Sequence, residues 1–403
     1  MKNVLFLTLL DFNTFDERNI YSDLLREFIK NGHNVYCISP VERRRNVQTH
    51  FEENGHILKL KIGNTQKTNI IEKGFSTLMI ESRFVHALKK YFSDIKFDLV
   101  LYSTPPITLV GAVNYIKKRD GAKTYLMLKD IFPQNAVDLG MISKSGLKGC
   151  IYKYFRAREK RLYKVSDKIG CMSQANVNYI LENNPEISSD KVEVCPNCID
   201  IQDVRLTAEE RMAMRQKYEI PSDKKVFVLG GNLGKPQGIP FLIECLKTQL
   251  NNRKAFFLIV GDGTEAVKLR EFLLNVNPSN IKLMQILAVE EYDRLLAACD
   301  VGMLFLDHRF TIPNFPSRIL GYMQAGLPIL ACTDANTDMG QVITNGGFGK
   351  WCESDGTQAA ESFIDFFCQN DVSNMGQVSL EYLKNNYSTE LLYEMIAKSI
   401  NKY

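Results

Sequence analysis

The sequence predicts an α/β protein made of two Rossmann-like, doubly wound domains that face a central cleft. Short apolar runs alternate with helical segments from the first residues onward. A polar, charged segment near position 203 interrupts this alternation, and a second alternating series follows it. Strands that alternate with helices form parallel sheets with right-handed crossovers, and such sheets bind ligands at the carboxyl ends of their strands.

The first domain is predicted to span residues 1–203. Its strands are short apolar runs, and its helices carry apolar residues at helical spacing. The predicted strands are 4–10, 33–39, 97–103, 124–129, 168–172 and 191–195, and the predicted helices are 20–31, a segment after Pro106 and a segment ending at 182. Charged residues dominate 199–222, which predicts an interdomain connection.

The second domain is predicted to span residues 204–385 and repeats the alternation. A last amphipathic helix within 386–403 is expected to pack back on the first domain. The predicted strands are 225–229, 255–260, 280–287, 301–306 and 328–331, and the predicted helices are 239–250, a segment after 263, 290–298 and a segment from Ser317.

The composition is that of a soluble globular chain. The 403 residues are 45% hydrophobic and 24% charged, which suits two or three domains of about 150 residues each. The 50 basic and 46 acidic residues are too balanced to favour a nucleic-acid partner. No apolar run reaches the roughly 18 residues of a membrane span, and the apolar start stops at Asp11 without a signal-peptide cleavage site. We expect a cytoplasmic protein, either free or peripheral on the inner face of the cell membrane.

Cysteine and histidine usage gives no metal-site pattern. Ten cysteines are scattered singly, mostly in apolar runs, where cysteine behaves as a small hydrophobe. The one close pair, Cys195 and Cys198, follows a strand and has no second Cys/His pair beside it. The five histidines do not cluster, and no Asp-x-Asp sequence occurs. We therefore expect a reducing compartment and no bound metal.

Three segments that follow strands of the second domain are suited to a phosphate. Glycines allow backbone amides to approach a diphosphate, lysine and arginine supply positive charge, and Ser317 is expected to cap a helix. Each segment alone is also explained as an ordinary turn, but three at one sheet edge favour an anion site. The candidate residues are Gly231, Asn232, Lys235 and Gln237 in the first segment, Gly261, Asp262 and Gly263 in the second, and Arg309, Asn314, Ser317 and Arg318 in the third. We call the first segment the glycine loop.

These motifs together resemble the family 4 glycosyltransferases of GT-B fold, over nearly the whole chain. Gly32 to Val35, Asp130 to Pro133, Pro196 to Asp200, the two glycine segments and Pro316 to Pro328 carry the resemblance. Within the family the chain is most similar to bacterial sugar transferases of capsule and O-antigen assembly, including N-acetylfucosamine transferases. The resemblance implies a retaining, metal-independent hexosyltransferase without a cofactor. It would move an N-acetylated or deoxy hexose from a UDP-sugar to a saccharide acceptor, free or linked to polyprenyl diphosphate.

The chain departs from the family pattern at four of these positions. Pro313 and Gly321 stand where family members commonly have two glutamates, and Asn232 and Gln237 replace an arginine and a lysine of the glycine loop. Two interpretations follow. Either substitute groups such as Lys235 hold the donor, or the activity is lost.

Two charged residues of the first domain are candidate catalytic groups. Asp130 follows a strand and is placed either to orient or deprotonate an acceptor hydroxyl, or to cap a helix. Arg18 follows the first strand and is either a cation that reaches across the cleft to the diphosphate, or a surface charge at a helix start.

A basic amphipathic segment, 147–168, is a candidate for membrane contact. Its apolar residues approximate one helical face. It therefore either lies on anionic lipid or packs against the core with a basic solvated side. The apolar residues are Leu147, Ile151, Tyr154, Phe155, Leu162 and Val165, and the basic ones are Lys148, Lys153, Arg156, Arg158, Lys160, Arg161, Lys164 and Lys168.

Two further functions fit the same fold. A sugar-nucleotide epimerase of GT-B fold would release a free sugar and UDP. A non-catalytic partner subunit would bind sugar nucleotide without turnover, an alternative that Pro313 and Gly321 motivate.

Overall fold

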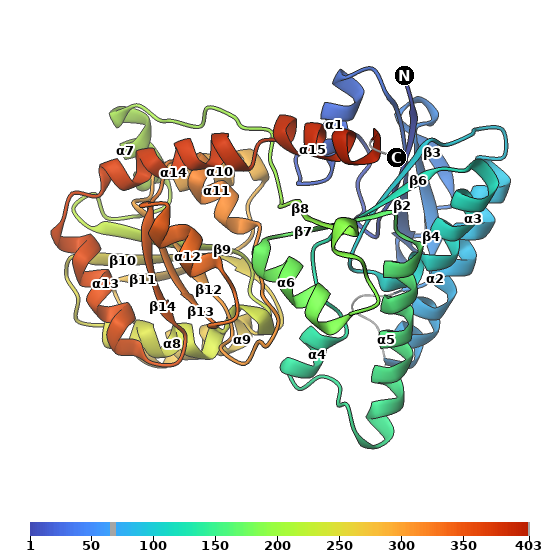
Figure 1. Cartoon of the computed structure of the whole chain (residues 1–403). Coiled ribbons are helices and arrows are strands. Elements are labelled where there is room, and N and C mark those ends of the chain that lie inside the picture. Colours follow the sequence, from blue (N-terminus) through green and yellow to red (C-terminus); the bar gives the residue numbers. More distant parts are fainter. Residues whose placement is uncertain (65–69, 402–403) are drawn as a thin grey trace. The chain divides into compact units, whose positions relative to one another are not determined.

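The computed structural model describes residues 1–64 and 70–401, with the side chains of 70–78, 147–148 and 401 outside that description. The chain divides into two compact units. Unit 1 comprises Met1–Asp200 with Thr389–Tyr403, and unit 2 comprises Ile201–Ser388. Each unit has one largely parallel sheet with helices on both faces (Figure 1). The predicted α/β fold with two Rossmann-like domains is therefore confirmed.

The sheet of unit 1 has eight strands in the order β3-β4-β2-β1-β5-β6-β7-β8. Among the described strands only β3 runs antiparallel to its neighbour. Sequence order reverses between β1 and β5, which makes this the switch point of the sheet. The strands are β1 (Asn3–Leu7), β2 (Asn34–Glu42), β3 (His50–Glu52), β4 (Ile57–Ile62), β5 (Leu99–Ser103), β6 (Lys123–Leu128), β7 (Lys168–Cys171) and β8 (Val192–Val194).

The last helix of the chain belongs to unit 1 and lies beside α1 in Figure 1. Leu392 and Ile396 are buried in the core of this unit, and Tyr393 Oη lies 2.9 Å from His33 Nε2. The helices of unit 1 are α1 (Ser22–Lys30), α2 (Ile70–Tyr91), α3 (Val110–Asp120), α4 (Gln134–Asp138), α5 (Gly146–Val165), α6 (Gln174–Asn183) and α15 (Thr389–Asn401).

The sheet of unit 2 has six parallel strands in the order β11-β10-β9-β12-β13-β14. Counted from its first strand this is the order 3-2-1-4-5-6 of a doubly wound dinucleotide-binding fold, with its switch point between β9 and β12. The strands are β9 (Lys225–Asn232), β10 (Ala255–Asp262), β11 (Ile281–Met284), β12 (Val301–Phe305), β13 (Ile329–Thr333) and β14 (Gly349–Glu353).

Helices cover both faces of this second sheet. In Figure 1 α8, α9 and α13 lie on one face, and α7, α10, α11 and α14 lie on the other. The helices of unit 2 are α7 (Ala208–Lys217), α8 (Ile239–Thr248), α9 (Ala266–Val276), α10 (Val289–Ala297), α11 (Arg318–Gln324), α12 (Met339–Asn345), α13 (Thr357–Gln369) and α14 (Ser373–Asn386).

The segment predicted as an interdomain connection contains α7, so that prediction is wrong for its middle part. Thr207 and Glu210 form a capping box, with Thr207 Oγ1 accepting the Glu210 amide at 3.2 Å. Buried Arg215 donates to the Ala298 carbonyl at 2.9 Å and to Asp300 at 2.7 Å. The helix α7 is anchored by buried Arg215 and has few apolar residues. Its charged composition was therefore interpreted as a linker.

Candidate functional site

The switch point of unit 2 brings the predicted phosphate segments to one edge of its sheet. β9 and β10 pair in register to their ends, so Gly261 lies opposite Gly231 and Asp262 opposite Asn232. β12 ends on the other side of β9 and leads into the loop before α11. Ligands of doubly wound sheets bind at such a position. We call the carboxyl ends of β9, β10 and β12, with the loops that follow them, the switch edge.

The glycines of the switch edge have different reasons for being glycine. At Gly261 an added Cβ would lie 2.0 Å from the Gly231 carbonyl oxygen, and at Gly263 it would lie 2.5 Å from the Leu233 carbonyl. Backbone packing therefore requires glycine at both positions. Gly231 has φ +100°, and a Cβ there would lie in ordinary contact with Arg318 Nη2 at 3.9 Å. Its positive φ, not crowding, therefore favours glycine, and the Arg318 guanidinium lies close beside it.

Arg318 is the charged group of this edge. Its Nη2 donates to the Asn232 carbonyl oxygen at 3.1 Å, which holds the guanidinium beside the glycine loop. Its Nη1 is buried and has no hydrogen-bond partner among the described residues. A buried charged donor without a partner is unfavourable, and native structures normally satisfy such a group with a ligand, ion or water. The arrangement therefore suits an anion at Nη1.

Ser317 does not cap the helix that follows it, so the expected cap is wrong. Its backbone is already helical, with φ −64° and ψ −18°, and its side chain accepts no amide. A capping residue needs extended dihedrals for its oxygen to reach the amides of the first turn. Since α11 has only seven residues, Arg318 rather than the helix end supplies the charge.

Two tyrosines support the glycine loop from behind, and the sequence analysis missed both. The Gly230 amide donates to Tyr322 Oη at 3.0 Å, and an added Cβ at Gly230 would lie 1.6 Å from Tyr292 Oη. Burial raises the pKa of Tyr322, while the positive charge of Arg318 opposes that rise. In a sequence, an aromatic residue on the buried face of a helix is interpreted as part of the hydrophobic core. The structure is needed to show that Tyr322 reaches β9.

The other residues of the glycine loop differ in how far they are free to bind. Lys235 is exposed and has no side-chain partner within the part of the chain that the structure describes. Gln237 shapes the loop, because its Oε1 accepts the Gly234 amide at 3.1 Å. Lys235 therefore remains a second cation for the switch edge, whereas Gln237 already uses its acceptor.

Two other charged candidates at this edge are neutralised locally. Arg309 binds Asp307 through two contacts of 2.9 and 2.7 Å. Burial alone would raise the pKa of Asp307, but the hydrogen bonds from Arg309 hold it below its usual value. Asp262 is paired with Arg270 at 2.7 Å. Asn314 differs, since its Nδ2 is buried without a partner among the described residues.

Neither position of the missing family glutamates offers a carboxylate. Pro313 is buried, and at Gly321 an added Cβ would lie 3.4 Å from Leu296 Cδ1. Position 321 is therefore close to the packing between α11 and α10.

In unit 1, Asp130 lies just beyond the carboxyl end of β6, next to the switch point of that sheet. Thr104 Oγ1 donates to its carbonyl at 2.9 Å, and Asn135 Nδ2 donates to its Oδ2 at 2.6 Å. Burial raises the pKa of Asp130 to about 6, while the Ile131 amide and Asn135 oppose the rise and Glu159 adds to it. Asp130 therefore exchanges its proton near neutral pH. The sequence analysis missed Thr104 and Asn135, which belong to other segments.

Arg18 lies in the loop between β1 and α1 and is half-buried. Burial raises the pKa of Asp23, and the positive charges of Arg26 and Arg18 oppose that rise. Arg18 is thus close enough to a carboxylate of its own unit to influence its titration.

The basic segment forms α5, and its predicted apolar face is divided. Leu162 is buried in unit 1, and Phe155 packs edge-on against Phe132 at 5.0 Å. Ile151 and Tyr154 are 47% and 38% exposed. The side chains of Leu147 and Lys148 lie outside the described residues. Several of the cations, Lys153, Lys160, Arg161 and Lys164, are exposed, whereas Arg156 pairs with Glu159 and Arg158 with Glu81.

Among the described residues, no three His, Cys, Asp or Glu side chains gather in an arrangement that would hold a metal ion. The helices within the described residues also include none with an apolar stretch long enough to cross a bilayer.

Two Rossmann-like units in tandem, one with a phosphate-suited switch edge, are the architecture of the GT-B fold. Residues 19–203 match the family model Glycosyltransferase Family 4, and residues 224–367 match the model Glycosyl transferases group 1. The two halves of the chain thus carry a glycosyltransferase family 4 domain and a glycosyl transferases group 1 domain, which confirms the resemblance seen in the sequence and makes the protein a glycosyltransferase.

Two relatives named as glycosyltransferases match at similar identity. WbjE of Pseudomonas aeruginosa is 24% identical over 345 residues, which cover 84% of this chain and 83% of the relative. WcaI of Escherichia coli K12, named as a colanic acid biosynthesis glycosyl transferase, is 24% identical over 251 residues, which cover 61% of this chain and 60% of the relative.

Solved structures share the fold. Sucrose-phosphate synthase from Thermosynechococcus elongatus aligns with a TM-score of 0.77 at 12% identity, covering 100% of this chain and 99% of the other. HepE from Anabaena in complex with UDP-glucose aligns with a TM-score of 0.70 at 13% identity, covering 100% of both chains. At these identities the likeness establishes the fold alone.

Proposed function

We propose that this protein is a retaining, metal-independent glycosyltransferase of bacterial surface polysaccharide synthesis. It transfers an N-acetylated or deoxy hexose from a UDP-sugar to a saccharide acceptor, which is linked to polyprenyl diphosphate. The relatives' names support the polysaccharide assignment, and the UDP and UDP-glucose bound to HepE support the nucleotide. Retention of configuration rests on the family resemblance.

The observation that carries the donor assignment is the unpaired Nη1 of Arg318 at the switch edge. Its guanidinium is held by the Asn232 carbonyl and lies beside Gly231 of the glycine loop. A diphosphate placed there accepts from Nη1, from backbone amides of the loop and from Lys235. Asn314 Nδ2, also unpaired, is a donor for a sugar or ribose hydroxyl.

The same cations stabilise the leaving diphosphate. As the bond between the sugar and the diphosphate breaks, negative charge grows on the diphosphate oxygens. Fixed donors aimed at developing charge are effective catalysts because they need no reorganisation. In this proposal Arg318 and Lys235 take the part that a divalent cation plays in metal-dependent transferases.

Asp130 is the proposed acceptor residue of unit 1. A carboxyl with a pKa of about 6 is mostly ionised at neutral pH and still basic enough to accept a proton from a hydroxyl during transfer. Asn135 and the Ile131 amide hold the carboxylate in place, and its remaining acceptor positions are proposed to receive the hydroxyl of the acceptor. Arg18 is proposed to contribute charge to a diphosphate-bearing substrate.

Peripheral membrane contact through α5 is part of this proposal. Ile151 and Tyr154 are exposed apolar groups, and the neighbouring lysines supply positive charge for an anionic surface. A lipid-linked acceptor would be presented at such a surface.

Thermal stabilisation by a panel of UDP-, GDP- and dTDP-sugars tests the donor, because a ligand at 100 times its Kd adds about 2.7 kcal/mol of stability. The expected result is a shift with UDP-sugars, and no shift with UDP would refute the nucleotide. Product analysis then separates the activities. Glycoside formed only with acceptor supports the transferase, free sugar released without acceptor identifies an epimerase, and binding without turnover identifies a non-catalytic subunit.

A further inference from the structure

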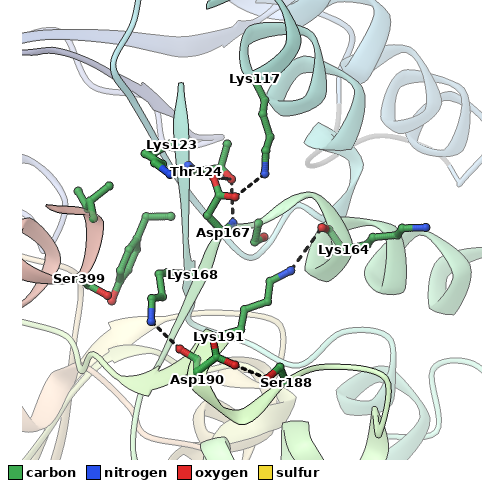
Figure 2. A pocket seen from close by; sticks show the side chains of 13 residues that line it. Lys117, Lys123, Thr124, Lys164, Asp167, Lys168, Ser188, Asp190, Lys191 and Ser399 are labelled. Carbon is green, nitrogen blue, oxygen red and sulfur yellow. Dashed lines mark hydrogen bonds and ion pairs between the residues drawn. The ribbon is translucent and has the colours of Figure 1, made fainter. Parts of the chain in front are cut away.

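Unit 1 contains a basic pocket at the amino ends of its strands, the edge opposite to Asp130. The cavity has a volume of about 340 Å³ and lies between the starts of β6 and β7, the ends of α3 and α5, and α15 (Figure 2). Since β6 begins at Lys123 and Asp130 follows its end, roughly 20 Å of strand separates the two sites. The lysines that line the pocket are Lys117, Lys123, Lys164, Lys168 and Lys191.

The carboxylates of this pocket do not balance its lysines. Asp167 and Asp190 are the acids that line it, which leaves a net charge of +3. Asp167 is already engaged, because it accepts from Lys117 Nζ at 2.6 Å and from both the amide and the hydroxyl of Thr124 at 2.9 Å. The positive charge is therefore only partly neutralised by the protein.

Lys191 and Lys123 are the amines of this pocket on which a ligand would depend. Lys191 Nζ donates to the Lys164 carbonyl at 3.3 Å. Lys123 has no side-chain partner among the described residues. Lys168, by contrast, is buried and engaged, because it donates to the backbone carbonyl of Asp190 and pairs with the Glu193 carboxylate at 4.0 Å. Lys191 and Lys123 therefore retain donor capacity for a ligand.

Lys191 and Lys117 both line the pocket but have different partners. Figure 2 shows their amines directed toward the Lys164 carbonyl and Asp167, whereas Lys168 is directed toward Asp190. Burial lowers the pKa of Lys191, and the positive charge of Lys117 lowers it further. A bound anion would favour the charged amine and so oppose both effects.

The basic surface continues beyond this cavity. A neighbouring hollow of about 510 Å³ shares Lys164 and Lys191 and adds Lys160 and Arg161 from α5. Glu186 is the acid that lines it, paired with Lys160 at 3.0 Å.

We propose that the basic pocket of unit 1 binds a phosphomonoester, from either a soluble sugar or polyol phosphate or a lipid head group. A volume of about 340 Å³ is in the range of small-molecule sites. A net charge of +3 complements a dianionic phosphate, and lysine amines recognise phosphate as point charges. This site is separate from the switch edge of unit 2 and does not depend on the function proposed for that edge.

Calorimetric titration of the full chain with glycerol 3-phosphate tests the pocket. The double variant Lys123→Gln/Lys191→Gln removes two of its amines, and Lys118→Gln removes an exposed lysine of α3 outside it. We expect binding to weaken about tenfold per lysine in the double variant and to stay unchanged in Lys118→Gln. The variant Lys123→Arg/Lys191→Arg should retain binding, and UDP affinity should be the same in all four proteins.

A vesicle arm separates the two sources of the phosphate. Sedimentation with phosphatidylcholine vesicles, with and without phosphatidic acid, is compared for the wild type and the double Gln variant. Loss of phosphatidic acid binding in the variant supports a lipid head group, and equal sedimentation of both proteins alongside weakened glycerol 3-phosphate binding supports a soluble ester. The proposal is overturned if the wild type binds neither probe, or if the double variant binds both as well as the wild type.

Discussion

Replacement of Arg318 by methionine is the most direct test of the switch edge. Methionine approximates the apolar stem of arginine and removes the guanidinium, so the buried packing of the side chain is largely kept. Nη2 donates one of its two N–H groups to the Asn232 carbonyl at 3.1 Å, and the buried Nη1, which has no partner among the described residues, is the donor proposed for a diphosphate. The variant therefore removes one charge-assisted hydrogen bond to the ligand.

A hydrogen bond to a charged group contributes about 1.5–3 kcal/mol, which corresponds to roughly 10- to 150-fold in Kd. Calorimetric titration with UDP should show this weakening in Arg318→Met. Arg253→Met is the matched control, since Arg253 is an exposed arginine just before the amino end of β10. Loss of the partly exposed bond to Asn232 costs only about 0.5–1.5 kcal/mol of stability, so the fold should persist. Unchanged UDP affinity in Arg318→Met, or equal weakening in Arg253→Met, would refute the reasoning.

Two further predictions concern Asp130 and Arg215. Because the active form of Asp130 is the carboxylate and its pKa is about 6, wild-type kcat/KM should rise as pH increases through about 6. Asp130→Asn should lose this pH-dependent rise and about 10²- to 10⁴-fold of turnover, while its UDP affinity stays unchanged. The folded-state pKa lies above the usual 3.8, so the protonated carboxyl is favoured by folding. The free energy of unfolding of the wild type should therefore fall as pH rises from about 4 to 6, and urea titrations of Asp130→Asn should not show this fall. Arg215→Met leaves Asp300 and several carbonyls without their buried partner. It should lower the free energy of unfolding in urea by about 3–5 kcal/mol. The control is Arg211→Met, at a 37% exposed side chain that pairs with the same carboxylate, and it should cost at most about 1 kcal/mol.

The alternation of apolar strands and helices predicted two α/β sheets, but β3, β4 and β14 of the described strands were not among those predicted. In β4 two lysines interrupt the apolar residues, and the other failures involve elements that are polar or short. The helix α7 carries its signal in the capping box Thr207 to Glu210, which the sequence displays, but its charged surface favoured a linker. β14 has only five residues and buries few of them, so no apolar run marks it.

The candidate site was predictable to the level of segments, not of individual contacts. Glycines after β9 and β10 and a cation before α11 could be placed at one edge because parallel strands end together. Whether a charge is free could not be predicted: Arg309 is neutralised by Asp307 two residues away, while Arg318 binds a carbonyl far from it in sequence. Such pairings depend on side-chain directions in loops, which periodicity does not determine.

The absence of acidic groups at Pro313 and Gly321 changes what the switch edge is built to recognise. A carboxylate beside Arg318 would bind hydroxyls well but would also neutralise the guanidinium, as Asp307 does for Arg309. Among the described residues no acid forms an ion pair with Arg318. Its full charge is therefore available to a phosphate, while hydroxyl recognition falls to neutral groups such as Asn314 Nδ2. This distribution favours a donor held mainly by its diphosphate, with the sugar selected by shape and by a few neutral hydrogen bonds.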